Sequence, residues 1–218
     1  MANKKATSER LITYFMDYVL THGTHPKSVY LFTKENNLKE EDFYKFCANF
    51  EALEKDIFKV FFDNTLALLE KNEEYLVFDS KNKLISFYYT FFEMLTANRS
   101  YVVYALEQKK DRLKSLEVLK TLRTSFKGYV KSLDLDRLKI ENERLSKIQN
   151  RSIEESAWIQ LLITMKFWLD DTSPSFEKTD IFIEKSLQTG FELMDYKPLE
   201  KLIDFGKFIL KEKTNITV

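Results

Sequence analysis

The chain has 218 residues, which allows one or two ordinary domains and a substantial hydrophobic core. Hydrophobic residues make up 44% of it and aromatic residues 15%, and its 34 basic residues balance 34 acidic ones, so the composition is not that of a disordered protein. Only four Gly and three Pro are available for tight turns or phosphate-binding loops, which argues against β-rich folds and favours an all-α protein.

Three short helices are predicted at the start of the chain. The first begins after Thr7 or Ser8, which are possible caps, and ends at Gly23, a residue type that commonly terminates helices. Its apolar stripe consists of Leu11, Ile12, Phe15, Tyr18 and Val19. Two shorter helices are expected over 27–36 and 39–46, separated by an Asn-Asn pair that suits a sharp turn.

Longer helices are predicted after residue 50, because apolar residues continue to recur every three or four positions. They are expected over 51–75, 80–96, 100–108, 111–133, 153–169, 176–196 and 198–213. The stretch 135–150 is strongly charged and is expected to be a solvated helix or a connection. Ser173 followed by Pro174 marks a helix start, because Ser is a common N-cap and Pro is tolerated at the first helical position.

The opening helices carry residues at the positions typical of a known DNA-binding headpiece. These are Arg10, Leu11 and Ile12, then Gly23, Ser28, Val29, Lys34, Phe43 and Tyr44, and finally Glu51, Ala52 and Leu53. Segment 10–53 thereby resembles the headpiece of the TetR family of transcriptional regulators. The resemblance implies a TetR-like fold with a helix-turn-helix headpiece over 1–53 and a larger helical bundle over 54–218. It also implies a homodimer whose bundle binds an apolar or amphipathic ligand.

The positions that would contact DNA depart from that family's pattern. The third helix begins with Glu40, Glu41 and Asp42, where the family usually has small, hydroxyl or basic residues, and carboxylates repel phosphates. Residues 1–53 carry seven basic and seven acidic side chains, so the headpiece has no positive excess. One interpretation is a headpiece that does not read DNA. The alternative is residual DNA contact through Lys27, Ser28, Lys39, Tyr44 and Lys45.

Segment 170–184 carries a second pattern. An acidic pair is followed by Ser-Pro, an aromatic-Glu pair, Thr, and Phe with Ile-Glu. This segment is similar to the closing helices of the lipid-binding accessory protein family of ubiquinone biosynthesis, which shares the TetR fold. That resemblance implies a lipid-like ligand and no DNA reading. The family often has Trp where this chain has Asp180, so contacts at that position do not carry over.

Aromatic residues are concentrated in the predicted bundle and could line a ligand pocket. The candidate pocket residues are Phe87, Tyr88, Phe91, Tyr101, Tyr104, Phe126, Trp158 and Phe167. Plain core packing is the competing interpretation for each of them, because helices that are hydrophobic nearly all round are also typical of buried cores.

The last predicted helix has a basic amphipathic pattern. Five lysines accompany three acids from Lys197 to Lys213, beside an apolar stripe. Such a helix can lie on a membrane surface, with contact expected through Leu199, Leu202, Ile203, Phe205 and Lys207. Docking on the protein's own domain is the competing interpretation.

Catalytic groupings are not evident. His22 and His25 are the only histidines, and no Gly-x-Ser-x-Gly or Glu-x-x-His pattern is present, so we expect neither a metal site nor a cofactor nor an enzyme. Cys47 cannot form an intramolecular disulfide, and the most apolar segments are shorter than a bilayer span, which favours a cytoplasmic protein. Membrane contact by the last helix would make it peripheral to the membrane.

The sequence therefore predicts a non-enzymatic TetR-like homodimer that binds an apolar or lipid-like ligand, with its dimer contact near 153–196. The alternative function is a ligand-responsive TetR-family repressor that binds DNA through residues 27–45, in which ligand and DNA affinities are coupled.

Overall fold

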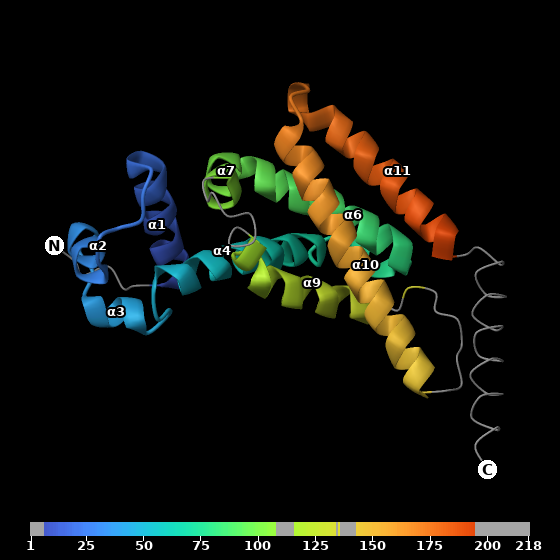
Figure 1. The fold of residues 1–218 in the computed structure, drawn as a ribbon, viewed down its shortest axis with the longest axis horizontal. Coiled ribbons are helices and arrows are strands. Elements are labelled where there is room, and N and C mark those ends of the chain that lie inside the picture. Colours follow the sequence, from blue (N-terminus) through green and yellow to red (C-terminus); the bar gives the residue numbers. More distant parts are fainter. Residues whose placement is uncertain (1–6, 108–115, 134, 136–142, 195–218) are drawn as a thin grey trace, which may run out of the picture. The chain divides into compact units, whose positions relative to one another are not determined.

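The structure is a computed structural model that describes residues 7–107, 116–133, 135 and 143–194 (Figure 1). Every regular element in these ranges is a helix, which confirms the all-α prediction. In chain order they are α1 (Ser8–His22), α2 (Val29–Glu35), α3 (Glu40–Tyr44), α4 (Phe50–Leu69), α5 (Glu73–Val77), α6 (Ser80–Ala97), α7 (Arg99–Glu107), α9 (Lys120–Ser132), α10 (Glu143–Asp170), the 3-10 helix η1 (Pro174–Phe176) and α11 (Glu177–Met194).

The first helices begin and end where local chemistry predicts. The Thr7 hydroxyl accepts a hydrogen bond from the Arg10 backbone N–H at 3.3 Å, which caps α1. Gly23 ends α1 with φ of 67°, and its N–H bonds to the Val19 carbonyl. Ser28 caps α2 in the same way as Thr7 caps α1, and Asn37 provides the left-handed turn between α2 and α3 with φ of 54°. The predicted caps and the predicted turn are confirmed.

Four phenylalanines form the core of the predicted headpiece, residues 1–53, within its described part. Phe15 of α1, Phe32 of α2, Phe43 of α3 and Phe50 of α4 are buried, and their ring centroids lie 5.2 to 6.5 Å apart in the contacts between them. Aromatic rings at these separations pack favourably, so the short helices α2 and α3 are held by tertiary contacts rather than by their own length.

The chain divides into two compact units, which we describe separately. The first comprises Met1–Val77 and Ser86–Tyr129 and the second Phe78–Ile85 and Val130–Val218. In the first, α4 packs beside α6 and α9 through the rings of Phe62, Phe87 and Phe126, whose neighbouring centroids are 5.4 and 5.5 Å apart. The hydroxyls of Tyr75 and Tyr129 lie 2.9 Å apart at the edge of this core.

In the second unit, α10 and α11 run antiparallel and are joined by η1 (Figure 1). The buried carboxylate of Asp171 organises this corner. It accepts hydrogen bonds from the N–H and hydroxyl of Ser173 at 2.8 and 2.7 Å, and from those of Thr179 at 2.9 and 2.7 Å. A single side chain therefore satisfies backbone donors both in the turn and at the start of α11.

Several helix boundaries differ from the sequence prediction. The expected helix over 51–75 is divided, because α4 ends at Leu69 and the Asn72 side chain accepts the Glu74 N–H before α5. The helix expected from 153 is continuous with the charged stretch before it, because α10 begins at Glu143; of the two interpretations of 135–150, residues 143–150 follow the helical one. The chain forms η1 before α11, with Phe176 at a positive φ.

The remaining predicted segments are only partly covered. A turn at Val118 and Leu119 precedes α9, and residues 111–115 lie outside the described ranges. The predicted last helix, 198–213, also lies outside them. Within the part of the chain that the structure describes, no helix is both long and apolar enough to cross a bilayer.

Candidate functional site

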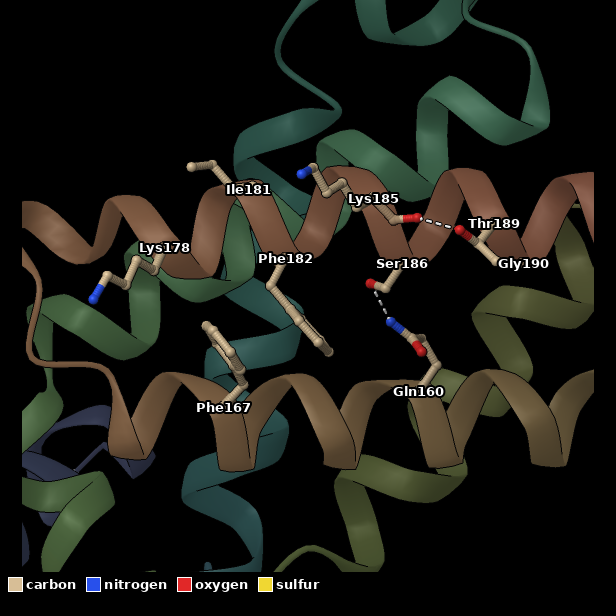
Figure 2. Close-up of a pocket in the computed structure, with 9 residues that line it drawn as sticks. All are labelled: Gln160, Phe167, Lys178, Ile181, Phe182, Lys185, Ser186, Thr189 and Gly190. Carbon is tan, nitrogen blue, oxygen red and sulfur yellow. Dashed lines mark hydrogen bonds between the residues drawn. The ribbon is translucent and has the colours of Figure 1, made fainter.

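A hollow with a volume of about 690 Å³ lies between α10 and α11. We call it the α10–α11 groove (Figure 2). Its lining residues are Gln160, Phe167, Lys178, Ile181, Phe182, Lys185, Ser186, Thr189 and Gly190. A hollow of this size can accept either a small ligand or the side chains of a protein partner.

A hydrogen-bonded pair crosses the groove. The Gln160 amide donates to the Ser186 hydroxyl at 2.6 Å, so the two side chains point toward one another in Figure 2. Gln160 also approaches the buried Thr164 hydroxyl at 3.4 Å. Because the Gln160–Ser186 bond joins α10 to α11, it fixes the register of the two helices at this point.

Beside that pair the groove is apolar. The rings of Phe167 and Phe182 are stacked, with centroids 4.5 Å apart and planes 10° apart (Figure 2). The same two helices expose Ile159, Ile163 and Ile181, each with half or more of its surface in solvent. Large exposed apolar side chains gathered on one pair of helices are typical of a protein contact surface.

The predicted pocket residues fall in several places. Phe87, Tyr88, Phe91 and Phe126 are fully buried and pack on one another, with the Phe87 ring 5.3 Å from Phe91 and 5.5 Å from Phe126. Burial raises the pKa of the Tyr88 hydroxyl far above its usual value. These four residues form one aromatic core in the first unit.

Tyr101 and Tyr104 lie on α7 with their rings 6.4 Å apart. Tyr101 is completely buried, and within the described structure its hydroxyl has no hydrogen-bond partner. Burial, reinforced by the negative charge of Glu54, raises the pKa of both hydroxyls. In the second unit, Trp158 is buried and Phe167 lines the α10–α11 groove.

The headpiece residues proposed to contact DNA are mostly engaged locally. Lys45 forms an ion pair with Asp42 at 2.7 Å, and this hydrogen bond lowers the pKa of the Asp42 carboxyl. Lys39 pairs with Glu41 at 3.4 Å, and the exposed Tyr44 hydroxyl donates to Glu40 at 3.4 Å. The carboxylates in the first turn of α3 are therefore the ion-pair partners of Lys39 and Lys45.

The other two headpiece candidates lie at the start of α2. Lys27 is exposed. Ser28 accepts the Leu31 N–H at 3.2 Å, so its hydroxyl serves the helix as an N-cap. Ser28 therefore has a structural role at the start of α2, and this role does not depend on DNA binding.

Each histidine has a single polar partner among the described contacts. His25 Nε2 lies 2.9 Å from the Glu54 carboxylate, which is buried, so His25 is an internal partner of that group. His22 instead approaches the Tyr18 carbonyl at 2.9 Å. No group of three metal-ligating side chains occurs among the described residues.

Cys47 is buried as expected for a small hydrophobe, and burial together with the charge of Asp56 raises the pKa of its thiol to about 11. Sequence reasoning did not identify Glu54 or Asp171 as structural centres. The partner of Glu54 is His25, 29 residues away in the sequence. The most distant partner of Asp171 is Thr179, eight residues further along the chain.

Comparison with known proteins identifies the family. A family described as "Tetracyclin repressor-like, C-terminal domain" matches residues 83–209, more than half of the chain. No curated protein matches the chain. The matched range includes the aromatic residues of α6 and α7 as well as α10, α11 and the groove between them. The chain therefore belongs to the tetracycline-repressor-like family.

Proposed function

We propose that this TetR-like protein acts by binding rather than by catalysis, holding an apolar or lipid-like molecule in its C-terminal domain while its headpiece has given up DNA reading. The observation that carries the second part is the pairing of Lys39 with Glu41 and of Lys45 with Asp42. A regulator of this family would need such cations for DNA phosphates.

The negative charges of α3 oppose DNA binding. Exposed ion pairs are weak and can exchange partners, so the pairing alone does not prevent a lysine from reaching a phosphate. The carboxylates, however, all belong to the first turn of the five-residue helix α3 and would be carried toward the duplex with the lysines. The repulsion adds to the absence of any net positive charge over 1–53.

The α10–α11 surface supports a homodimer. It combines three exposed isoleucines with the apolar lining of the α10–α11 groove, all on two adjacent antiparallel helices. A second copy placing the same surface against it would bury these side chains around a two-fold axis. The dimer contact expected near 153–196 coincides with this surface.

The apolar ligand is supported by the family match over 83–209 and by the density of aromatic side chains within it. The narrower choice of a lipid-like ligand rests on the similarity of 170–184 to the ubiquinone accessory family. Part of that similarity has a structural origin, because Asp171, Ser173 and Thr179 form the cap of α11.

A ligand-responsive repressor is the second candidate function. Family membership favours it, as do the exposed Tyr44 and Lys27 and the well-formed cap at Ser28. In that case ligand binding in the bundle would change the affinity of two headpieces for DNA through a coupling free energy.

Two measurements test the proposal. Fluorescence anisotropy at low salt, with a duplex from the gene's own upstream region, should show no saturable sequence-dependent binding by the wild type. Replacing the three acids of 40–42 by Ser should produce weak, salt-sensitive binding, whereas the same change at Glu70, Glu73 and Glu74 should not. Specific binding by the wild type would establish the repressor instead.

Organic extraction of the purified protein, followed by mass spectrometry, tests the ligand. We expect an apolar or lipid-like compound in stoichiometric amount. An empty protein that also fails to bind fatty acids or quinones would overturn the ligand part of the proposal and leave a role in protein contact alone.

A further inference from the structure

A second hollow lies within the first unit, between α1 of the headpiece and α7. It has a volume of about 300 Å³, the lower end of the range for small-molecule sites. We call it the α1–α7 groove. Its lining residues are Val19, Leu20, Gly23, Ser100, Val103, Tyr104 and Glu107. Nothing in the proposed function uses this groove, which is separate from the groove between α10 and α11.

The charge found in this groove is negative. Among the residues that the structure describes, Glu107 is the only one lining the groove with a formal charge. Gly23 is the C-cap of α1, and Glu107 lies on α7. Helix C-termini carry partial negative charge, so the end of α1 and the Glu107 carboxylate act in the same direction.

The remaining wall is apolar and aromatic. Val19, Leu20 and Val103 supply aliphatic surface, and the half-buried Tyr104 supplies a ring whose face can attract a cation. Ser100 adds a hydroxyl that can accept a hydrogen bond. This combination suits a small molecule with one apolar end and one positively charged, hydrogen-bond-donating end.

Residues next to the groove also contribute negative electrostatic potential. The Tyr104 ring lies 6.4 Å from that of Tyr101, whose buried hydroxyl has no partner within the described structure. The buried carboxylate of Glu54 is close enough to raise the pKa of both hydroxyls. Its charge therefore adds to the negative potential at Tyr104.

We propose that the α1–α7 groove binds a small organic cation, an ammonium or amidinium group on a compact apolar body. This site is distinct from the apolar-ligand site of the C-terminal domain. Because one wall is the first helix of the headpiece, the bound cation would contact α1 and α7 together and stabilise their packing.

The full-length protein can be titrated calorimetrically with three probes of nearly equal shape: benzamidinium, benzamide and benzoate. At low ionic strength benzamidinium should bind about tenfold more tightly than benzamide, because both the ring and the carboxylate favour a cation. Benzoate should not bind. The preference for benzamidinium should weaken as salt is added, since Glu107 is exposed.

Two variants locate the site. Glu107→Gln should weaken benzamidinium binding by about threefold or more and leave benzamide unchanged. The control Glu93→Gln removes an exposed carboxylate of α6 in the same unit and should change nothing. Ser100→Trp should fill the groove and abolish binding of all probes.

The proposal is wrong if benzamidinium binds no better than benzamide, or not at all. Equal losses in Glu107→Gln and Glu93→Gln, or retained binding in Ser100→Trp, would also overturn it. These results are independent of DNA binding and lipid extraction, so this site and the proposed function can fail separately.

Discussion

At the scale of single residues, Asp171 has the clearest energetic role. Burial acts to raise the pKa of its carboxyl, but the hydrogen bonds from Ser173 and Thr179 outweigh burial and hold the pKa at about 2. The ionised side chain therefore stabilises the folded state, since the unfolded value is near 3.8. Four donors converge on this one group, from the turn and from the start of α11.

Asp171→Asn should lower the free energy of unfolding by about 2 kcal/mol near neutral pH, because an amide cannot accept from all four donors. The folded-state pKa is depressed, so the difference between wild type and variant should be full above about pH 5 and shrink as pH falls toward 2. Urea denaturation across this pH range measures it. The neighbouring exposed Asp170→Asn should have little effect at any pH; equal effects of the two would contradict this role.

At Tyr101, by contrast, we expect a substitution to increase stability, because its buried hydroxyl has no partner within the described structure. A buried polar group without a partner costs about 1–3 kcal/mol, so Tyr101→Phe should raise the free energy of unfolding by about 1 kcal/mol. Tyr75→Phe is the matched control: it removes a hydroxyl that lies 2.9 Å from that of Tyr129 and should destabilise. Urea titrations at one fixed protein concentration compare them. Destabilisation by Tyr101→Phe would show that its hydroxyl has a partner in solution.

At the scale of helices, the parts that could be predicted are those set by local chemistry. Thr7, Gly23 and Ser28 act on backbone groups three or four residues away, so their roles are visible in the sequence. The sequence does not decide between helix and connection for 143–150, because this stretch is charged and shows no apolar contrast. In the structure it continues α10, whose later turns are packed.

The candidate site was less predictable because it depends on which helix faces meet. Aromatic content alone cannot distinguish Phe87, which is enclosed by other rings, from Phe167, which lines a groove. Likewise, nothing near Glu54 in the sequence indicates that His25 is its partner, since 29 residues separate them. These are facts of tertiary packing.

The amphipathic pattern of 198–213 leads to a prediction about that segment. If it lies on membranes, the full chain should co-sediment with vesicles containing anionic lipid, because lysines and apolar residues then act together. A chain truncated after Tyr196 should not. Leu202→Glu should release the full chain, whereas Glu200→Gln should not. Absence of co-sedimentation by the full chain would favour docking of this segment on the protein.

At the scale of the whole molecule, the α10–α11 surface predicts a homodimer. Ile163 exposes half of its surface on α10. A lysine there would require its charge to be buried against the partner, so Ile163→Lys should convert the dimer to a monomer in size-exclusion chromatography with light scattering. Leu76→Lys is a matched control, because Leu76 is equally exposed but lies on α5.

Dimerisation should also appear in thermal unfolding. The melting temperature of a folded dimer that unfolds to single chains rises with protein concentration, whereas that of a monomer does not. The wild type and Leu76→Lys should therefore show this dependence, and Ile163→Lys should lose it while keeping its helical circular dichroism. A wild type whose melting temperature is independent of concentration and whose mass is that of one chain would exclude the dimer. The exposed isoleucines would then need a different partner, because so much apolar surface on two adjacent helices is unusual for a monomer.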